Sequence, residues 1–330
     1  YGCALIMRNK NYLFVDGRYT LQANNQSGRL FDIVTIPNRF PSDVLKKKKL
    51  KIGFDPKLHT QKSLKILFNG TNCKLKAINK NLIYKLWKKK ENSSSNKFYM
   101  LPNKAIGQNY RLKINKLVNI LNKKKIDFQF ISSSENIAWL LNFRGKDSDF
   151  TPMPNSYLTI DNNKKVSLFC DLRKIDSYFR RKFKNIEILD IENTSLFLSK
   201  IKNKSILLDS LTCSIYFGDI LKKNNKILEF QDPVYLLKSI KTKNEIKNTI
   251  RSHIEDGAAL TRFLMWLKRN YKKKNINEIS AQEKLFKFRK KNKSFNFSSF
   301  PTISGSGPNG AIIHYKASKK SNRKLRRGDI

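Results

Sequence analysis

Residues 299–315 read SFPTISGSGPNGAIIHY and are the most informative stretch of this sequence. Three glycines and one proline fall within residues 304–310, a density that favours a fixed turn whose backbone can approach another group closely. The apolar residues that follow, 311–315, predict a strand that carries His314 at its end. An ordinary hairpin loop with a core His314 bonded to backbone would explain the same residues without any chemistry.

Two helices are predicted before this stretch. From Lys243 to Leu267, apolar residues recur at helical spacing, which indicates one helix of roughly 25 residues with a single apolar face. The tetrapeptide SAQE at 280–283 matches a capping box and predicts a second helix that runs to about Lys291. This change of pattern near residue 241 marks the start of a separate unit.

The residues before 241 alternate between strand-like and helix-like segments. Residues 4–7 and 12–15 predict a hairpin that ends at Asp16-Gly17, and a helix is expected over 20–28. Later segments with the same character are the helix at 111–125, the strands at 128–131 and 206–209, and a hairpin at 157–160 and 166–170. This alternation predicts an α/β fold. The polar segment 88–97 predicts a linker, with a domain boundary near residue 105.

Length and composition suit a multidomain globular protein. The chain has 330 residues, of which 39% are hydrophobic and 28% charged, enough for two or three domains with real cores. Global disorder is therefore excluded. The longest apolar runs, such as 3–7 and 137–141, reach five residues, far below the roughly 18 that a membrane-spanning helix needs. No membrane segment or membrane partner is expected.

The charge balance has two interpretations. Lys and Arg number 68 against 25 Asp and Glu, which gives a formal net charge of +43, a value typical of nucleic-acid-binding proteins. The bias is spread over the whole chain together with abundant Asn and Ile, and these residue types share A/T-rich codons. The alternating aromatic triplets at 128–130 and 295–297 look like strand faces. Coding bias and a functional polyanion surface both stay open, and no specific nucleic-acid partner is expected.

Cysteine and histidine usage points to no metal site of a common type. The four cysteines form no CxxC pair and predict reduced thiols, as in a cytosolic protein. Of the three histidines, His59 and His253 lie in contexts that suit a structural or solvent-exposed role. The sequence contains no HExxH, Walker or GxSxG motif, so neither a zinc protease, a P-loop nor a serine hydrolase is predicted.

Taken whole, residues 299–315 resemble the signature of the Xaa-Pro aminopeptidases, also called aminopeptidase P. Further segments resemble the same family in the same order, namely VDGRY at 15–19, NIAWLLNFRG at 136–145, KNEI at 243–246 and DGAALTRF at 256–263. The resemblance therefore extends over essentially the entire chain.

The resemblance implies a three-domain architecture and a metal-dependent activity. Two creatinase-like N-terminal α/β domains would span 1–104 and 105–240, and the start of a pita-bread α+β catalytic domain would span 241–330. The family is a group of metallopeptidases that release the N-terminal residue from peptides with proline in second position. It uses two divalent metal ions, usually manganese, bridged by a water or hydroxide that attacks the scissile carbonyl. A cytoplasmic homodimer is the matching expectation.

Only one catalytic position of the family is matched here. His314 corresponds to the histidine that lines the substrate site and serves in proton transfer or in hydrogen bonding to the bound peptide. None of the five metal ligands is matched, since the first would come a few residues after Asp329, which is not itself that ligand. We therefore expect an N-terminal and central fragment that holds no metal and is inactive alone.

Two other functions compete with this one. Some pita-bread relatives have lost their metal ligands and bind peptides or histones, so a catalytically silent binding module is the main alternative. Nucleic-acid binding rests on the net charge alone, and a steep fall of binding with added salt would favour it.

Overall fold

The computed structural model describes residues 2–87, 96–272 and 275–329. They form two compact units, one from residues 1–48, 70–72 and 249–330 and the other from residues 49–69 and 73–248. The linker predicted at 88–97 lies almost entirely outside the described residues. The predicted domain limits at 104 and 240 stay predictions.

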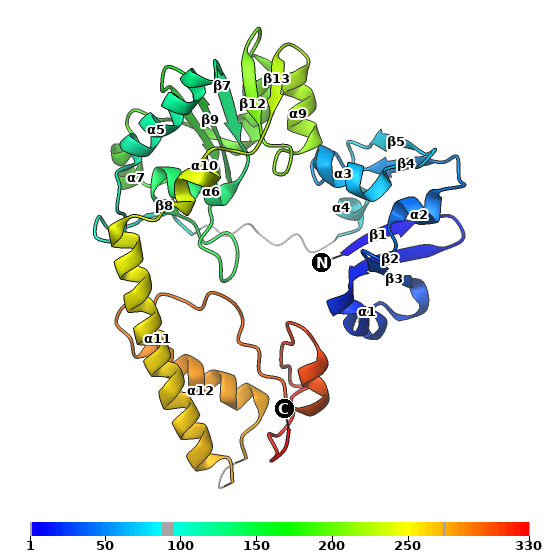
Figure 1. Ribbon diagram of the computed structural model, residues 1–330, viewed down its shortest axis with the longest axis vertical. Helices are drawn as coiled ribbons and strands as arrows, with labels where there is room; N and C mark the ends of the chain where they lie inside the picture. The colour runs from blue at the N-terminus through cyan, green and yellow to red at the C-terminus, as the bar shows by residue number, and fades with distance from the viewer. Residues whose placement is uncertain (1, 88–95, 273–274, 330) are drawn as a thin grey trace. The chain divides into compact units, whose positions relative to one another are not determined.

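A three-stranded sheet opens the first unit (Figure 1). β1 (Gly2–Ile6) and β2 (Asn11–Asp16) form the predicted hairpin, with Gly2 opposite Val15. α1 (Thr20–Ser27) then leads to β3 (Asp32–Ile36), which pairs in parallel with β2, and α2 (Pro41–Leu45) follows. Phe14 and Leu45 are fully buried in this small core. The predicted hairpin and helix are confirmed.

A six-stranded mixed sheet forms the centre of the second unit (Figure 1). Its strands, in spatial order, are β11 (Glu187–Asp190), β10 (Val166–Cys170), β9 (Ser156–Asp161), β7 (Phe128–Ile131), β12 (Ser205–Leu208) and β13 (Lys226–Glu229). β9 and β10 form the second predicted hairpin, whereas β12 runs parallel to both β7 and β13.

Side chains of this sheet alternate between two cores, as the two-residue period of a strand requires. Ile131 and Leu207 join one core together with residues of α5 (Tyr110–Lys123), α6 (Ser134–Leu141), α7 (Ser177–Lys182) and α10 (Val234–Ser239). Their neighbours Phe130 and Ile206 join the other core with residues of α8 (Thr194–Ser199) and α9 (Ile215–Lys222). A sheet covered by helices on both faces confirms the predicted α/β class.

The remaining elements of this unit are short. Its helices are α3 (Gln61–Phe68), α4 (Leu82–Leu86), α5 (Tyr110–Lys123), α6 (Ser134–Leu141), α7 (Ser177–Lys182), α8 (Thr194–Ser199), α9 (Ile215–Lys222) and α10 (Val234–Ser239). Its other strand pairs are β4 (Lys51–Phe54) with β5 (Lys74–Ala77) and β6 (Tyr99–Met100) with β8 (Phe143–Arg144).

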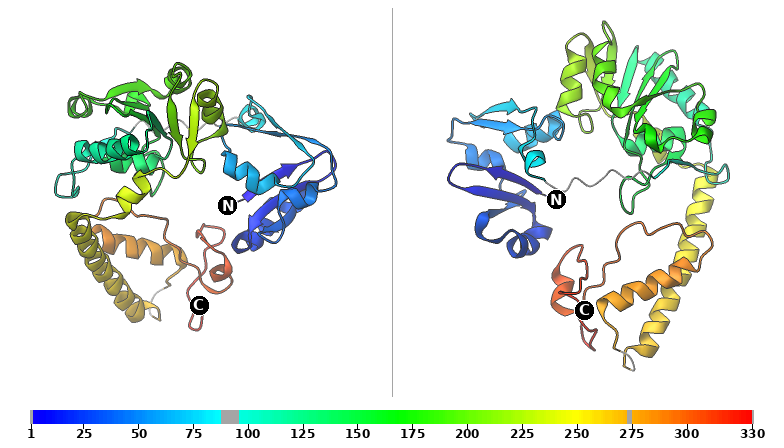
Figure 2. Two further views of the ribbon diagram at one scale, coloured as in Figure 1. Left: turned by 45° about the horizontal axis from the view of Figure 1, so that its top comes forward. Right: turned by 180° about the vertical axis from the view of Figure 1, so that it is seen from behind.

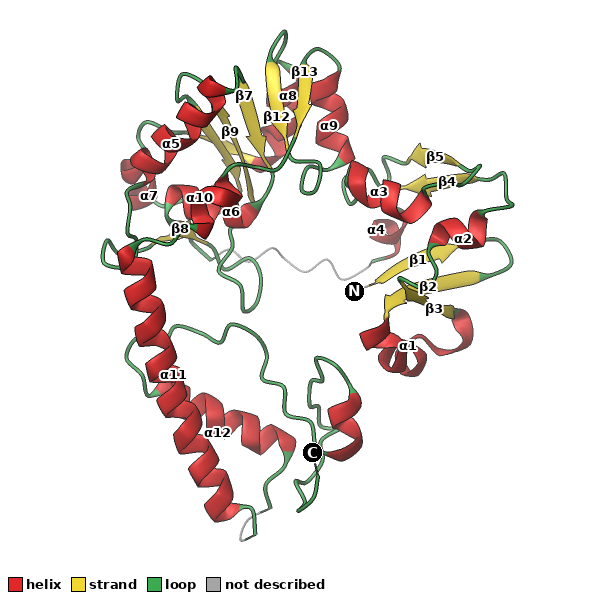
Figure 3. Ribbon diagram, viewed as in Figure 1, coloured by secondary structure: helices red, strands yellow, loops and turns green. Residues whose placement is uncertain are grey.

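The described chain after residue 242 consists of helices and loops (Figure 3). α11 (Lys243–Asn270) is the predicted long helix, and α12 (Glu278–Lys290) crosses it (Figure 2). The guanidinium of Arg289 joins the two helices through bonds of 2.7 and 3.0 Å to the carboxylate of Asp256. The capping box that we predicted to start at Ser280 is wrong by one turn: Asn277 is the cap, and Ser280 bonds back to it.

The apolar face of α11 is exposed in the described chain. Ile250, Ile254 and Leu264 are 57%, 68% and 54% exposed, and Ala259 is buried. The helix predicted from the apolar spacing is therefore confirmed. Most of its apolar face, however, is not packed against other described residues. None of the helices in the described ranges combines the length and the apolar composition needed to cross a membrane.

Candidate functional site

The glycine-rich segment forms a tight loop that leads into a short 3₁₀ helix, η5 (Gly307–Ala311). A side chain at Gly305 would begin 3.0 Å from the carbonyl oxygen of Asn309, and Gly307 has a φ of +55°. Glycine relieves both constraints because it lacks a Cβ. Pro308 lies in the first turn of η5, where a missing N–H costs no helical hydrogen bond. The predicted fixed turn is confirmed.

The strand predicted over residues 311–315 is wrong. The Ile312 N–H donates to the carbonyl of Asn309 (3.2 Å), and the Tyr315 N–H donates to the carbonyl of Ile312 (3.1 Å), so the chain turns here. A strand needs a hydrogen-bonded neighbour, and no segment within the described ranges pairs with these residues. The triplet 295–297, which we interpreted as a strand face, also lies in turn and loop.

The buried carboxylate of Glu278, the first residue of α12, holds this loop in place. It accepts hydrogen bonds from the amide of Asn309 (3.0 and 3.1 Å), the hydroxyl of Tyr315 (2.8 Å) and the backbone N–H groups of Ser306 (2.8 Å) and Arg323 (3.0 Å). Burial alone would raise the pKa of Glu278, but these hydrogen bonds outweigh burial and lower the pKa. One carboxylate thereby fixes the loop on both sides of η5.

His314 is exposed, directly before the buried Tyr315. Its φ of 55° lies in the left-handed region, which is strained for most residues other than glycine but less unusual for histidine. The hydrogen bond from the Tyr315 hydroxyl to Glu278 anchors the residue that directly follows His314. The Nδ1 atom of His314 lies 2.7 Å from the hydroxyl oxygen of Tyr19, which belongs to the VDGRY segment. The structure thus brings two of the sequence motifs together.

The other histidines and the cysteines occupy structural positions. His59 lies edge-on to Phe54, and burial lowers the pKa of its imidazole. His253 is exposed on α11, with its Nδ1 atom 2.9 Å from the carbonyl of its own helix at residue 249. None of the four cysteines, all of which lie in the described ranges, forms a disulfide, and burial raises the pKa of the Cys170 and Cys213 thiols to about 12. Thiols of this kind are unreactive, and they agree with the reduced cysteines that the sequence predicts.

The described residues form no metal site. Nowhere in the described ranges do three His, Cys, Asp or Glu side chains come together in a group that could hold a metal ion. Asp329 accepts hydrogen bonds from the Ser306 hydroxyl (2.7 Å) and the Arg326 N–H (3.2 Å), and the bond from Ser306 is the main cause of its lowered pKa. This carboxylate braces the glycine-rich loop. A two-metal centre therefore does not fit the described residues alone.

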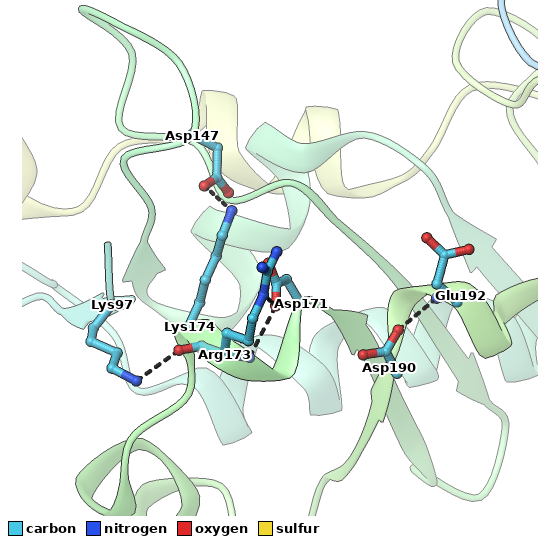
Figure 4. A network of polar contacts seen from close by, with 7 residues as sticks. All are labelled: Lys97, Asp147, Asp171, Arg173, Lys174, Asp190 and Glu192. Carbon is cyan, nitrogen blue, oxygen red and sulfur yellow. Dashed lines mark hydrogen bonds and ion pairs between the residues drawn. The ribbon is translucent and has the colours of Figure 1, made fainter. Parts of the chain in front are cut away.

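A second polar cluster lies in the other unit (Figure 4). The Lys174 ammonium pairs with the Asp147 carboxylate, and their side chains are only 4% and 11% exposed. Nearby, Arg173 pairs with Asp171 at 2.7 Å, and the Lys97 ammonium donates to the backbone carbonyl of Arg173. Each of these three cations has a partner within the cluster, which favours a structural role for it.

Sequence reasoning missed Glu278 and Tyr19 as parts of the site. Glutamate near a helix start is ordinarily exposed, so no local pattern shows that Glu278 is buried. Tyr19 lies in one of the segments that carried the resemblance, which is the one signal that could have identified it.

Two family comparisons match different parts of the chain. Residues 89–245 match the creatinase/prolidase N-terminal domain. Residues 248–330 match metallopeptidase family M24.

Three known proteins are similar over nearly the entire chain. The probable Xaa-Pro aminopeptidase P of Laccaria bicolor is 33% identical over 334 residues, which cover 96% of this chain and 51% of that protein. The Xaa-Pro aminopeptidase ApepP of Drosophila melanogaster is 32% identical over 346 residues, or 100% of this chain and 56% of that protein. The crystal structure of X-prolyl aminopeptidase from Caenorhabditis elegans, described as a cytosolic enzyme with a di-nuclear active site, superposes with a TM-score of 0.91 at 26% identity, covering 99% and 56% of the two chains. The chain spans about half the length of the curated relatives it matches.

Proposed function

This chain belongs to the aminopeptidase P family, and we propose that the whole protein releases the N-terminal residue from peptides whose second residue is proline. The observation that carries the proposal is the exposed imidazole of His314, presented by a loop that Glu278 and Asp329 brace. We propose the domain limits 1–104, 105–240 and 241–330 for this part of the protein.

The chemistry of the substrate suits an imidazole at this position. The bond before proline is a tertiary amide without an N–H, so its carbonyl oxygen is the group at the scissile bond that can form a hydrogen bond. The imidazole of His314 can donate to that oxygen through one ring nitrogen while the other ring nitrogen is held by the protein. His314 thereby binds and orients the peptide.

The metal centre, the assembly and the location are further parts of this proposal. We propose that the whole protein binds two divalent ions, expected to be manganese, which would supply an activated water. Their ligands would come from residues that correspond to the part of the relatives that this chain does not span. The di-nuclear site and cytosolic location stated for the Caenorhabditis elegans enzyme support the metals and a cytoplasmic protein. A homodimer is the expected assembly.

The test is the substitution His314→Ala in the whole protein. We expect kcat to fall by about a hundredfold, the usual scale for a positioned acid–base or hydrogen-bonding group. Hydrolysis of an Xaa-Pro dipeptide series with manganese present measures this loss. His253→Ala is the matched control, because that imidazole is exposed and bonded to its own helix, and it should leave kcat unchanged. A near-normal rate for His314→Ala would make His314 part of the scaffold.

A further inference from the structure

The contact between Tyr19 and His314 joins residues 295 positions apart within one compact unit. The hydroxyl oxygen of Tyr19 lies 2.7 Å from Nδ1 of His314, a short hydrogen bond, and the two ring centroids are 5.8 Å apart with the planes tilted by 40°. The hydrogen bond uses one nitrogen of the imidazole. It leaves Nε2 as the nitrogen that can face a ligand.

Tyr19 is held by the turn that the sequence DGRY forms after β2. The carboxylate of Asp16 accepts from the backbone N–H of Arg18 (3.0 Å) and from its guanidinium (2.8 and 3.0 Å). These bonds lower the pKa of Asp16 to about 2, so the carboxylate is charged at neutral pH. The Thr20 hydroxyl closes the turn on the carbonyl of Gly17 at 3.1 Å. The backbone that carries Tyr19 is therefore fixed by its own segment.

His314 is equally constrained from its side. Its backbone is in the left-handed region, and Tyr315 beside it is bonded to the buried Glu278. These contacts fix the Cα of His314 but leave the rotation of its exposed ring to other partners. The Tyr19 hydroxyl is the partner that restrains this rotation.

We propose that Tyr19 is a positioning residue for His314, whose hydroxyl donates to Nδ1 and keeps the proton of the neutral imidazole on Nε2. The inference rests on the proposed function, because the substrate determines whether Nδ1 of His314 donates or accepts in its hydrogen bond with Tyr19. A carbonyl oxygen before proline can only accept a hydrogen bond, so the nitrogen that faces it must carry the proton. With Nδ1 as acceptor from Tyr19, Nε2 is that donor.

The first experiment needs no activity. In the full 330-residue chain labelled with ¹⁵N-histidine, the ring nitrogens of the three histidines are observed above pH 8, and His314→Gln assigns the His314 signals. We expect Nδ1 of His314 to be unprotonated and Nε2 protonated. Tyr19→Phe should shift the ring-nitrogen signals of His314 and leave those of His59 and His253 unchanged. A protonated Nδ1, or no response to Tyr19→Phe, overturns the proposal.

The second experiment separates positioning from scaffold effects in the whole protein. Tyr19→Phe should lower kcat about five- to tenfold with KM nearly unchanged, the size expected for one neutral hydrogen bond. Tyr12→Phe is the matched control, since Tyr12 lies on the neighbouring strand and packs near Phe14, and it should leave kcat unchanged. If His314→Ala abolishes turnover while Tyr19→Phe has no effect on kcat, the positioning role is refuted and the proposed function stands. If His314→Ala itself leaves kcat near normal, His314 is part of the scaffold and the positioning role of Tyr19 fails with it, while the peptidase activity stands. If the whole protein releases no residue from Xaa-Pro peptides, the proposed function fails.

Discussion

The ammonium group of Lys174 is almost completely buried, and the carboxylate of Asp147 compensates its positive charge. Asp147 also accepts a hydrogen bond from the backbone N–H of Asn155 at 2.6 Å, so the carboxylate is fixed in place. Removing one partner of a buried ion pair leaves the other charge unpaired. We expect Lys174→Met to lower the free energy of unfolding by about 3–5 kcal/mol, measured by equilibrium urea denaturation.

The neighbouring residue supplies the control for this prediction. Arg173 forms an ion pair with Asp171, but its side chain is 69% exposed. Exposed pairs contribute about 0–1 kcal/mol, because water screens and competes with them. Arg173→Met should therefore have little effect. Equal losses for the two variants would show that burial does not decide the strength of these pairs.

Buried charges are the residues that the sequence predicted least well. Lys113 is 3% exposed, its ammonium donates to the carbonyl of Trp139 (2.8 Å) and to the amide oxygen of Asn142 (2.6 Å), and burial lowers its pKa to about 8. Lys174 and Glu278 are buried in the same manner. The chain has 68 Lys and Arg and 25 Asp and Glu, and no local pattern distinguishes these three residues from the rest. Their partners lie far away in sequence, and only the fold brings them together.

At the scale of elements, Glu278 links the start of α12 to the loop that presents His314. Glu278→Gln keeps the shape of the side chain but replaces one carboxylate oxygen by an NH₂ group. That oxygen now accepts hydrogen bonds from surrounding donors, and an NH₂ group cannot accept them. We expect a loss of about 2–3 kcal/mol in the free energy of unfolding at neutral pH, measured by urea denaturation. Glu283→Gln, on an exposed position of the same helix, is the control and should be neutral.

The pH dependence of this loss gives a second readout. The pKa of Glu278 is lower in the folded chain, so its stabilisation is complete above the unfolded pKa of about 4.3 and disappears as pH falls through the folded value. The stability difference between the wild type and Glu278→Gln should therefore be constant above about pH 6 and shrink below about pH 4. A difference that does not change down to pH 3 would contradict the role of the charged carboxylate.

The elements that sequence reasoning predicted correctly are those with a strong local period. The β1–β2 and β9–β10 hairpins each consist of two apolar segments separated by polar turn residues, and α11 keeps the apolar spacing of a helix. The failures lie where a tertiary contact overrides the local pattern. Residues 311–315 are apolar enough for a strand, but the side-chain bonds of Tyr315 and the turns at Asn309 and Ile312 bend the chain instead.

At the scale of the whole molecule, the family resemblance predicted more than any physical pattern did. The α/β class followed from alternation alone, whereas the place of His314 in a site followed only from the likeness of residues 299–315 to a known signature. The site itself could be predicted in part, because the glycine-rich loop is local, whereas Glu278, which braces it, and Tyr19, which contacts His314, come from other segments. The net charge of +43 had no comparable predictive value, since the sequence left both of its interpretations open.

The last prediction concerns the 330-residue chain on its own, with manganese. The described residues hold no group of three potential ligands, and the chain spans 51–56% of its curated relatives, so we expect no release of the N-terminal residue from an Xaa-Pro peptide. The assay compares this chain with the whole protein at equal concentration, and calorimetry measures manganese binding to both. Turnover by the 330 residues that disappears in His314→Ala would place a complete site within them and refute this expectation. A whole protein that binds peptides, but neither binds manganese nor hydrolyses the peptides, would instead identify the silent binding module. A loop that orients a carbonyl without an activated water can hold a peptide but cannot cleave it.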